Sequence, residues 1–148
     1  QLLDSNGNVT TDITKVVGYR LPTEAEWEFA ARGGKYNSPY KYSGSDYVDE
    51  VAWYSGNSNG EPQEVGKKAP NDLGIHDMSG NAYEWCTDWY GNYSGSAQTN
   101  PYNDTPDSGR VNRGGAWYND APRLALRGVA LPHRGYFRLG FRITRTVP

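Results

Sequence analysis

Cysteine, histidine and methionine are scarce in this sequence. It contains a single cysteine, Cys86, one methionine, and only two histidines, His76 and His133. One cysteine excludes an internal disulfide and any metal site built from several thiolates. The sequence also lacks a run of about eighteen apolar residues and the apolar core of a signal peptide, so it predicts no membrane-spanning helix. The net charge of −2 gives no basic field that would favour nucleic acid, and we expect none as a partner.

Glycine and large aromatic residues are abundant instead, with 18 Gly, 12 Tyr and 5 Trp among 148 residues. This length suits one domain with a real core, so we treat residues 1–148 as a single domain. Glycine favours turns and irregular loops, whereas tyrosine and tryptophan bury large areas. The composition therefore predicts a loop-rich scaffold with an aromatic core.

The clearest helix lies within residues 21–34. Thr23 and Glu26 have the spacing of a capping box, Trp27 begins an apolar face, and Gly33 can adopt the left-handed conformation that ends a helix. The three glutamates of this helix could be imagined as acid–base groups. Capping and solvation explain them better, because acidic residues favour the first turn and the exposed face of a helix.

Residues 71–90 combine crowded aromatics with two carboxylates, Asp77 and Glu84, separated by a glycine-containing turn. Aromatics at this density predict core packing. Two carboxylates brought together by a turn form a candidate site for a hard cation. His76 and Cys86 have no visible nucleophilic partners in the sequence, so we interpret them as core or surface residues.

Residues 110–142 form the most informative stretch. Its ends, 110–117 and 139–142, combine arginine, glycine and large aromatics in a way that is typical of packed structure. In the stretch between these ends, residues 118–138, the apolar residues recur with neither helical nor strand spacing. The stretch nevertheless contains Leu, Val, Tyr, Phe and Arg. It is either a binding surface or a long loop packed on the core, and the residues alone leave both alternatives open.

Four blocks of sequence together resemble the formylglycine-generating-enzyme (sulfatase-modifying factor) family. They are YRLPTEAEWEFAARGG at 19–34, GIHDMSGNAYEW at 74–85, RGGAW at 113–117 and LGFR at 139–142. The resemblance implies an α+β, C-type-lectin-like fold that is loop-rich and has little regular structure. The family domain normally has an earlier strand and helix before the first block. We therefore expect Gln1 to be the start of a fragment that lacks them.

The resemblance also bears on catalysis. Catalytic members use a pair of copper-binding cysteines after their Gly-Gly-Ser/Ala motif, but residues 118–138 contain no cysteine. Thiolate chemistry needs a thiol, and Cys86 matches no catalytic cysteine of the family. Related members with a histidine iron triad need more histidines than this chain has. We therefore expect no enzymatic activity and no required cofactor.

Calcium is the one candidate ion that the resemblance suggests. The family's calcium site maps onto Asp77, Gly80, Ala82 and Glu84, and the acidic side chains are kept. Oxygen ligands of this kind suit calcium. The same carboxylates could instead accept hydrogen bonds from backbone amides.

One non-enzymatic group within this fold is the variable proteins of diversity-generating retroelements, including variable surface lipoproteins of treponemes. These proteins use the same C-terminal segment as a hypervariable ligand-binding face, and their randomised codons cannot encode Lys, Gln, Glu, Met or Trp. All five residue types occur in positions 1–117 of this chain, and none occurs in positions 118–148. The pattern favours a similar origin for residues 110–142.

The leading hypothesis is a non-catalytic ligand-binding protein with a variable C-terminal face. Trp117, Arg127, Gly140 and Phe141 are expected to be buried supports. The partner is an unknown protein or other surface ligand. The resemblance implies the bacterial cell surface as the location, with the membrane reached only through a lipid anchor outside this chain. The predicted contact residues are Tyr118, Asn119, Asp120, Pro122, Leu126, Gly128, Val129, Ala130, Leu131, His133, Arg134, Tyr136, Phe137 and Arg138.

Two other functions stay open from the sequence. The first is a structural or protein-interaction accessory domain without diversity. The second is a cofactor-dependent enzyme with a rearranged site, which would require a deep polar pocket containing His133 with Asp120 or Asp77.

Overall fold

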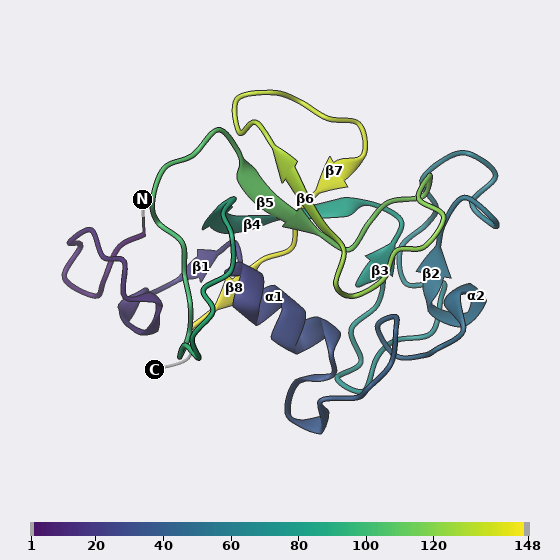
Figure 1. Ribbon diagram of the computed structural model, residues 1–148, viewed down its shortest axis with the longest axis horizontal. Coiled ribbons are helices and arrows are strands. Elements are labelled where there is room, and N and C mark those ends of the chain that lie inside the picture. Colours follow the sequence, from purple (N-terminus) through teal and green to yellow (C-terminus); the bar gives the residue numbers. More distant parts are fainter. Residues whose placement is uncertain (1, 147–148) are drawn as a thin grey trace.

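The computed structural model describes residues 2–146 as a set of short elements joined by long loops (Figure 1), and the expectation about Gln1 falls outside this range. The predicted α+β, loop-rich fold is confirmed. No helix in the described part of the chain is long and apolar enough to cross a membrane. The helices are η1 (Ile13–Lys15), α1 (Glu24–Ala31), η2 (Gly34–Tyr36) and α2 (Val48–Val51). The strands are β1 (Tyr19–Arg20), β2 (Ala52–Trp53), β3 (Ser79–Gly80), β4 (Tyr83–Trp89), β5 (Arg110–Arg113), β6 (Arg127–Ala130), β7 (Leu139–Gly140) and β8 (Thr144–Arg145).

A four-stranded sheet in the order β6-β5-β4-β7 forms the centre of the molecule. β5 is antiparallel to both β4 and β6, and β7 is parallel to β4. Two-stranded sheets, β1-β8 and β2-β3, lie outside it. Helix α1 contacts β4 and β5, the two inner strands of the central sheet (Figure 1). The outer strands β6 and β7 are those that flank the loop 131–138.

Helix α1 begins and ends as its sequence predicts. Thr23 Oγ1 accepts a hydrogen bond from Glu26 N, and the Glu26 carboxylate accepts one from Thr23 N, which completes the capping box. Gly33 follows the helix in the left-handed conformation, with φ of 82°. Trp27 and Ala31 are each 1% exposed and pack in the main hydrophobic cluster, so the predicted apolar face is confirmed.

Gly80 shows why the small sheet β2-β3 needs glycine. Its φ is +79°, and a Cβ at this position would collide with the backbone carbonyl of Trp53. Only glycine tolerates both the left-handed backbone and this close approach. The contact fixes the loop before β4, where the candidate calcium ligands lie.

The interpretation of the helix glutamates as capping and solvated groups was wrong for two of them. Glu24 is only 6% exposed, and its Oε1 lies 2.6 Å from Arg113 Nη1. Glu28 Oε2 lies 2.8 Å from Arg113 Nη2. The Arg113 side chain is fully buried, so these carboxylates neutralise a cation inside the core.

Candidate functional site

Residues 118–138, called here the C-terminal segment, are attached to the central sheet by β6 and, at their C-terminal end, by β7. The chain leaves the sheet at Arg113, where β5 ends, and the segment re-enters it as β6, where Val111 pairs with Val129 and Asn112 with Gly128. It then loops out again and joins β7, which pairs in parallel with Tyr83 and Glu84 of β4. The strand β6 is a regular element that the sequence pattern did not predict. Loops anchored this way on a rigid sheet are common carriers of binding residues.

The structure divides the fourteen predicted contact residues by exposure. Six are exposed: Asp120, Val129, His133, Arg134, Phe137 and Arg138. Six are half-buried: Tyr118, Asn119, Leu126, Gly128, Leu131 and Tyr136. The other two, Pro122 and Ala130, are buried, so their prediction as ligand contacts is corrected.

Packing explains why these two side chains are inaccessible. Pro122 lies so close to Gly115 that a Cβ on that glycine would approach the proline ring to 2.7 Å. Ala130 pairs with Arg110 in the β5-β6 ladder and is only 8% exposed. Both residues therefore hold the segment against the core.

Three further predicted residues also stabilise the segment. Asn119 Oδ1 accepts from Ala116 N at 2.7 Å, and Asp120 Oδ1 accepts from Ser55 Oγ at 2.8 Å. A Cβ on Gly128 would collide with Oδ1 of Asn112, which is buried. These contacts restrict what can occupy the positions, although Asp120 remains exposed.

The predicted supports are only partly confirmed. Trp117, Arg127 and Gly140 are half-buried, but Phe141 is 69% exposed. The prediction for Phe141 was wrong because β7 ends at Gly140 at the edge of the sheet, and no strand continues past it.

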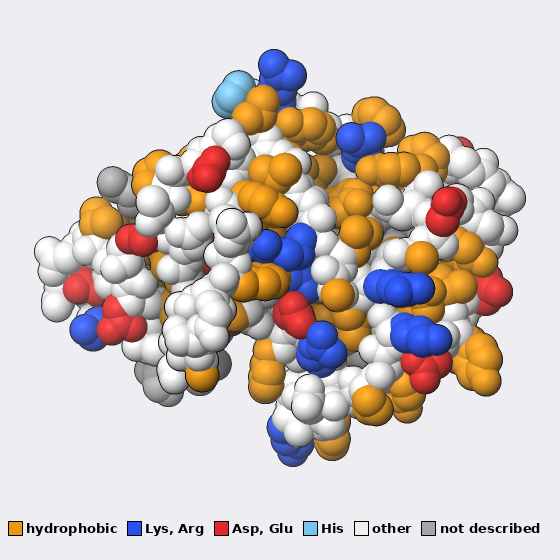
Figure 2. Space-filling model, in the orientation of Figure 1, with side chains coloured by type: hydrophobic (Ala, Val, Ile, Leu, Met, Phe, Trp, Pro, Cys, Tyr) orange, Lys and Arg blue, Asp and Glu red, His pale blue; other side chains and the backbone are white. Residues whose placement is uncertain are grey.

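A hollow of about 140 Å³, called here the small hollow, gathers six of the predicted residues. Aromatic rings surround it: the Tyr118 ring lies 6.4 Å from Tyr83 and 5.3 Å from Trp117, centroid to centroid. The Arg138 guanidinium lies 5.0 Å from the centre of the Tyr118 ring. The residues that line the small hollow are Tyr83, Asn112, Tyr118, Gly128, Val129, Ala130, Tyr136, Arg138 and Leu139. Around the loop that joins β6 and β7, apolar and basic side chains lie next to one another on the surface (Figure 2).

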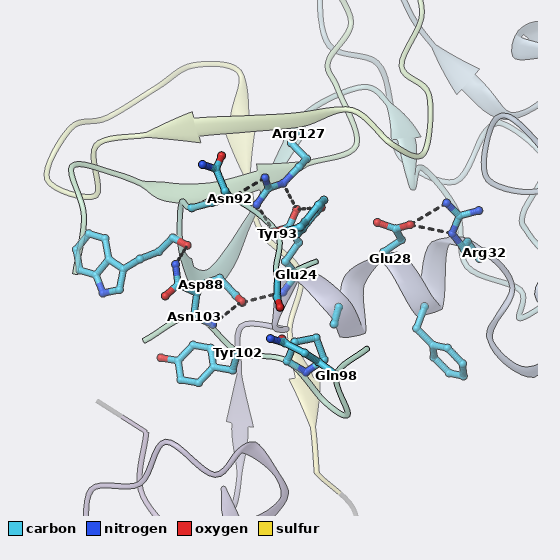
Figure 3. A pocket seen from close by; sticks show the side chains of 16 residues that line it. Glu24, Glu28, Arg32, Asp88, Asn92, Tyr93, Gln98, Tyr102, Asn103 and Arg127 are labelled. Atoms are coloured by element: carbon cyan, nitrogen blue, oxygen red, sulfur yellow. Dashed lines mark hydrogen bonds and ion pairs between the residues drawn. The ribbon is translucent and has the colours of Figure 1, made fainter. Parts of the chain in front are cut away.

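A larger hollow of about 700 Å³ lies between α1 and the loop 91–103 (Figure 3). The sequence analysis did not predict it. At its floor, Glu24 accepts hydrogen bonds from Arg127 Nε at 2.6 Å and from the Tyr93 hydroxyl at 2.9 Å. Burial alone would raise the pKa of Glu24, but hydrogen bonds from Arg127 and Arg113 outweigh it and hold the pKa below its usual range. The sequence signal that could have indicated the large hollow was the spacing of Glu24 and Glu28, which places both carboxylates on one face of the helix.

Asp88 also lines the large hollow. Burial raises its pKa to about 6, although its carboxylate accepts hydrogen bonds from the backbone amides of Asn103 and Glu24 (Figure 3). The remaining charges pair with each other, as in Glu28 with Arg32 at 2.8 Å. The large hollow thus has carboxylates but no histidine or cysteine among its lining residues.

Of the two carboxylates proposed to bind calcium, Glu84 is fully engaged with other protein groups, whereas Asp77 has one buried oxygen without a hydrogen-bond partner in residues 2–146. Both oxygens of Glu84 bond to Arg142, each at 2.6 Å, and one also accepts from Trp27 Nε1. Asp77 Oδ2 accepts from Gly66 N at 2.7 Å. Within residues 2–146, no three His, Cys, Asp or Glu side chains are grouped to hold a metal. A cation at Glu84 would have to displace a bidentate arginine.

The lone thiol and the two histidines are not assembled into a reactive site. Cys86 is fully buried, and burial raises the pKa of its thiol well above the usual range. His76 Nδ1 lies 2.8 Å from the carbonyl of Lys68, and His133 is exposed on the C-terminal segment. The enzymatic alternative would require a deep polar pocket that contains His133 with Asp120 or Asp77, and none of these three residues lines either of the two hollows.

Comparison with known proteins gives a consistent result. Residues 5–147 match the model of the sulfatase-modifying factor enzyme 1-like domain. The solved structure of Treponema denticola variable protein 1 superposes with a TM-score of 0.79 and 36% identity, covering 92% of this chain and 52% of that one.

Curated relatives carry several different names. The formylglycine-generating enzyme of Streptomyces coelicolor is 32% identical over 91% of this chain and 49% of its own length. A protein of Paenibacillus barcinonensis named chaperone protein LppX is 40% identical over 68% of this chain and 39% of its own length. The chain thus spans less than half the length of these two relatives.

Proposed function

Since the chain belongs to the sulfatase-modifying factor enzyme 1-like family, we propose that it uses this fold for ligand binding without catalysis, through the C-terminal segment. The observation that carries the proposal is the exposure of large side chains on the loop 131–138, which β6 and β7 anchor at its two ends. Phe137 is 82% exposed, and Arg134 and Arg138 of the same loop are exposed as well. Aromatics and arginine dominate binding energy at protein interfaces.

The likeness to the treponemal variable protein supports this proposal over an enzymatic one. The catalytic alternative finds little support in the chain. Residues 118–138 contain no cysteine, and Cys86 is buried with a raised pKa. The partner that we propose is a protein or other surface ligand at the bacterial cell surface, with no nucleic acid, no required cofactor, and any lipid anchor outside this chain.

Sequencing the codons for residues 110–142 from many sibling isolates tests the proposal. Codons for exposed positions such as Val129, His133 and Phe137 should differ between siblings and end in a pyrimidine. Codons for the buried Pro122 and Ala130 should vary less, because changes there disturb packing. Uniform codons across the segment would contradict a diversified face and favour an accessory domain without diversity.

A further inference from the structure

We propose that the small hollow is the subsite for one acidic side chain of a protein partner. This inference rests on the proposed function and names the chemistry of the group that the C-terminal segment would bind. The volume of the small hollow, about 140 Å³, is well below the roughly 300–1,000 Å³ of a typical small-molecule site. The small hollow therefore suits a single side chain of a larger partner.

The polar groups of the small hollow favour a carboxylate. Arg138 is exposed and lines the hollow, with its guanidinium over the ring of Tyr118. A guanidinium presents several N–H donors in a plane that matches a carboxylate. The Tyr136 hydroxyl accepts a hydrogen bond from Leu131 N at 3.1 Å, so its own hydrogen remains available for donation. Arg138 and Tyr136 therefore both have hydrogens that they can donate to a carboxylate in the small hollow.

The electrostatic surroundings point the same way. Residues 118–148 contain six arginines and a single acidic residue, Asp120, whose Oδ1 already accepts from Ser55. Two of these arginines are neutralised, Arg127 by Glu24 and Arg142 by Glu84. Arg134 and Arg138 have no ion-pair partner within residues 2–146. The C-terminal segment is thus locally basic on a protein whose net charge is −2.

The walls of the small hollow also suit the stem of an acidic side chain. Val129 and Leu139 provide apolar surface that can cover methylene groups, while Arg138 lies against the aromatic ring of Tyr118. An arginine held over an aromatic ring has fewer conformations to lose when it binds an anion. This arrangement assigns Arg138, rather than the other exposed arginines, as the anchor.

Peptide display on phage tests the inference, with random peptides fused at their C-terminal ends so that only side chains supply carboxylates. Clones that bind the wild-type chain and lose binding to Phe137→Ala define peptides that use the segment. We expect such peptides to share an Asp or Glu at a fixed position. Changing that residue to its amide should weaken binding about tenfold or more.

A double-mutant cycle links the acidic residue to Arg138. Arg138→Gln should weaken the parent peptide as much as the amide change does, and the two changes together should add little further loss. Arg123→Gln is the matched control: Arg123 is exposed on the same segment, lies outside the predicted contact residues and does not line the small hollow, so binding of the parent peptide should change by less than about twofold. Thermal unfolding of each variant confirms that the fold is retained.

The outcomes distinguish the two proposals. Segment-dependent peptides without a fixed acidic residue, or with no coupling to Arg138, overturn the acidic subsite and leave the ligand-binding function standing. A screen that yields no segment-dependent peptide counts against the proposed function, and the acidic subsite falls with it.

Discussion

Arginine has opposite surroundings in two regions of this molecule. Around helix α1, Arg113 has a fully buried side chain and Arg127 is half-buried, and both bond to Glu24. On the loop 131–138, Arg134 and Arg138 are exposed and have no ion-pair partner within the described residues. Buried charges that pair with each other are costly to separate and are not free to bind a ligand, whereas unpaired surface charges are free to do so. We therefore expect substitutions in the first region to affect stability and, under the proposed function, substitutions in the second to affect binding.

The strongest test of this difference is to remove the carboxylate of Glu24, which bonds to both Arg113 and Arg127. Glu24→Gln leaves the fully buried Arg113 paired only with Glu28 and removes the ionic partner of Arg127. Loss of one partner from a buried ion pair costs about 3–5 kcal/mol, and we expect a decrease of this size in the free energy of unfolding measured with urea. The matched change on the segment, Arg134→Gln, should cost less than about 0.5 kcal/mol. Equal losses from both changes would contradict this expectation.

A second prediction uses the pH dependence of stability. Burial raises the pKa of Asp88 to about 6, so the folded state keeps its proton at pH values where the unfolded chain has released it. This group therefore contributes less stability as the pH rises from about 4 to 6. Asparagine cannot titrate, so the free energy of unfolding of Asp88→Asn, relative to wild type, should rise by up to about 3 kcal/mol between pH 4 and 7.

Asp107→Asn is the control for this measurement. A hydrogen bond from Ser108 N lowers the pKa of the exposed Asp107. The wild-type carboxylate therefore gains stability as the pH rises, and the difference between variant and wild type should fall. A difference for Asp88→Asn that stays flat with pH would show that burial does not raise this pKa.

Two glycine substitutions within the C-terminal segment distinguish a position that packs against the core from one that does not. Gly128→Ala places a Cβ against the buried Asn112 and should cost about 1–3 kcal/mol, measured by thermal unfolding. At Gly135 an added Cβ meets no atom within 4 Å, so Gly135→Ala should leave stability unchanged or raise it by less than about 1 kcal/mol. Similar effects at both positions would show that the segment is not anchored through β6 as described.

The smallest effect is expected from the exposed residues themselves. A combined change of His133, Arg134 and Phe137 to alanine removes no buried contact, because all three side chains are exposed. The melting temperature should change by no more than a few degrees. A loss of ten degrees or more would mean that these residues support the fold and would weaken their assignment to recognition.

Local features of the fold were predictable from the sequence, and long-range ones were not. The capping box at Thr23 and Glu26 and the stop at Gly33 follow from rules that act within a few residues, and the structure confirms them. The role of Glu24 depends on Arg113 and Arg127, which are 89 and 103 positions away in the sequence. No local pattern indicates such partners.

The candidate site shows the same limit. Exposed aromatics and arginines could be predicted from the composition of residues 118–138, but Pro122 and Ala130 look like their neighbours in sequence and are buried. Phe141 was expected to be buried because the sequence LGFR at 139–142 is typical of packed structure, yet β7 ends at Gly140. Which side of the segment faces the core depends on register, and β6 supplies that register only through its pairing with β5.

The loop 131–138 connects β6 and β7, which are the two outermost strands of the central sheet (Figure 1). Both of its ends are therefore held at a fixed separation by strands that do not belong to it. The entropy lost on closing such a loop grows only slowly with its length, by about 0.6 kcal/mol for each doubling. We therefore expect the scaffold to accept a longer peptide between Leu131 and Arg138 with only a small loss of stability.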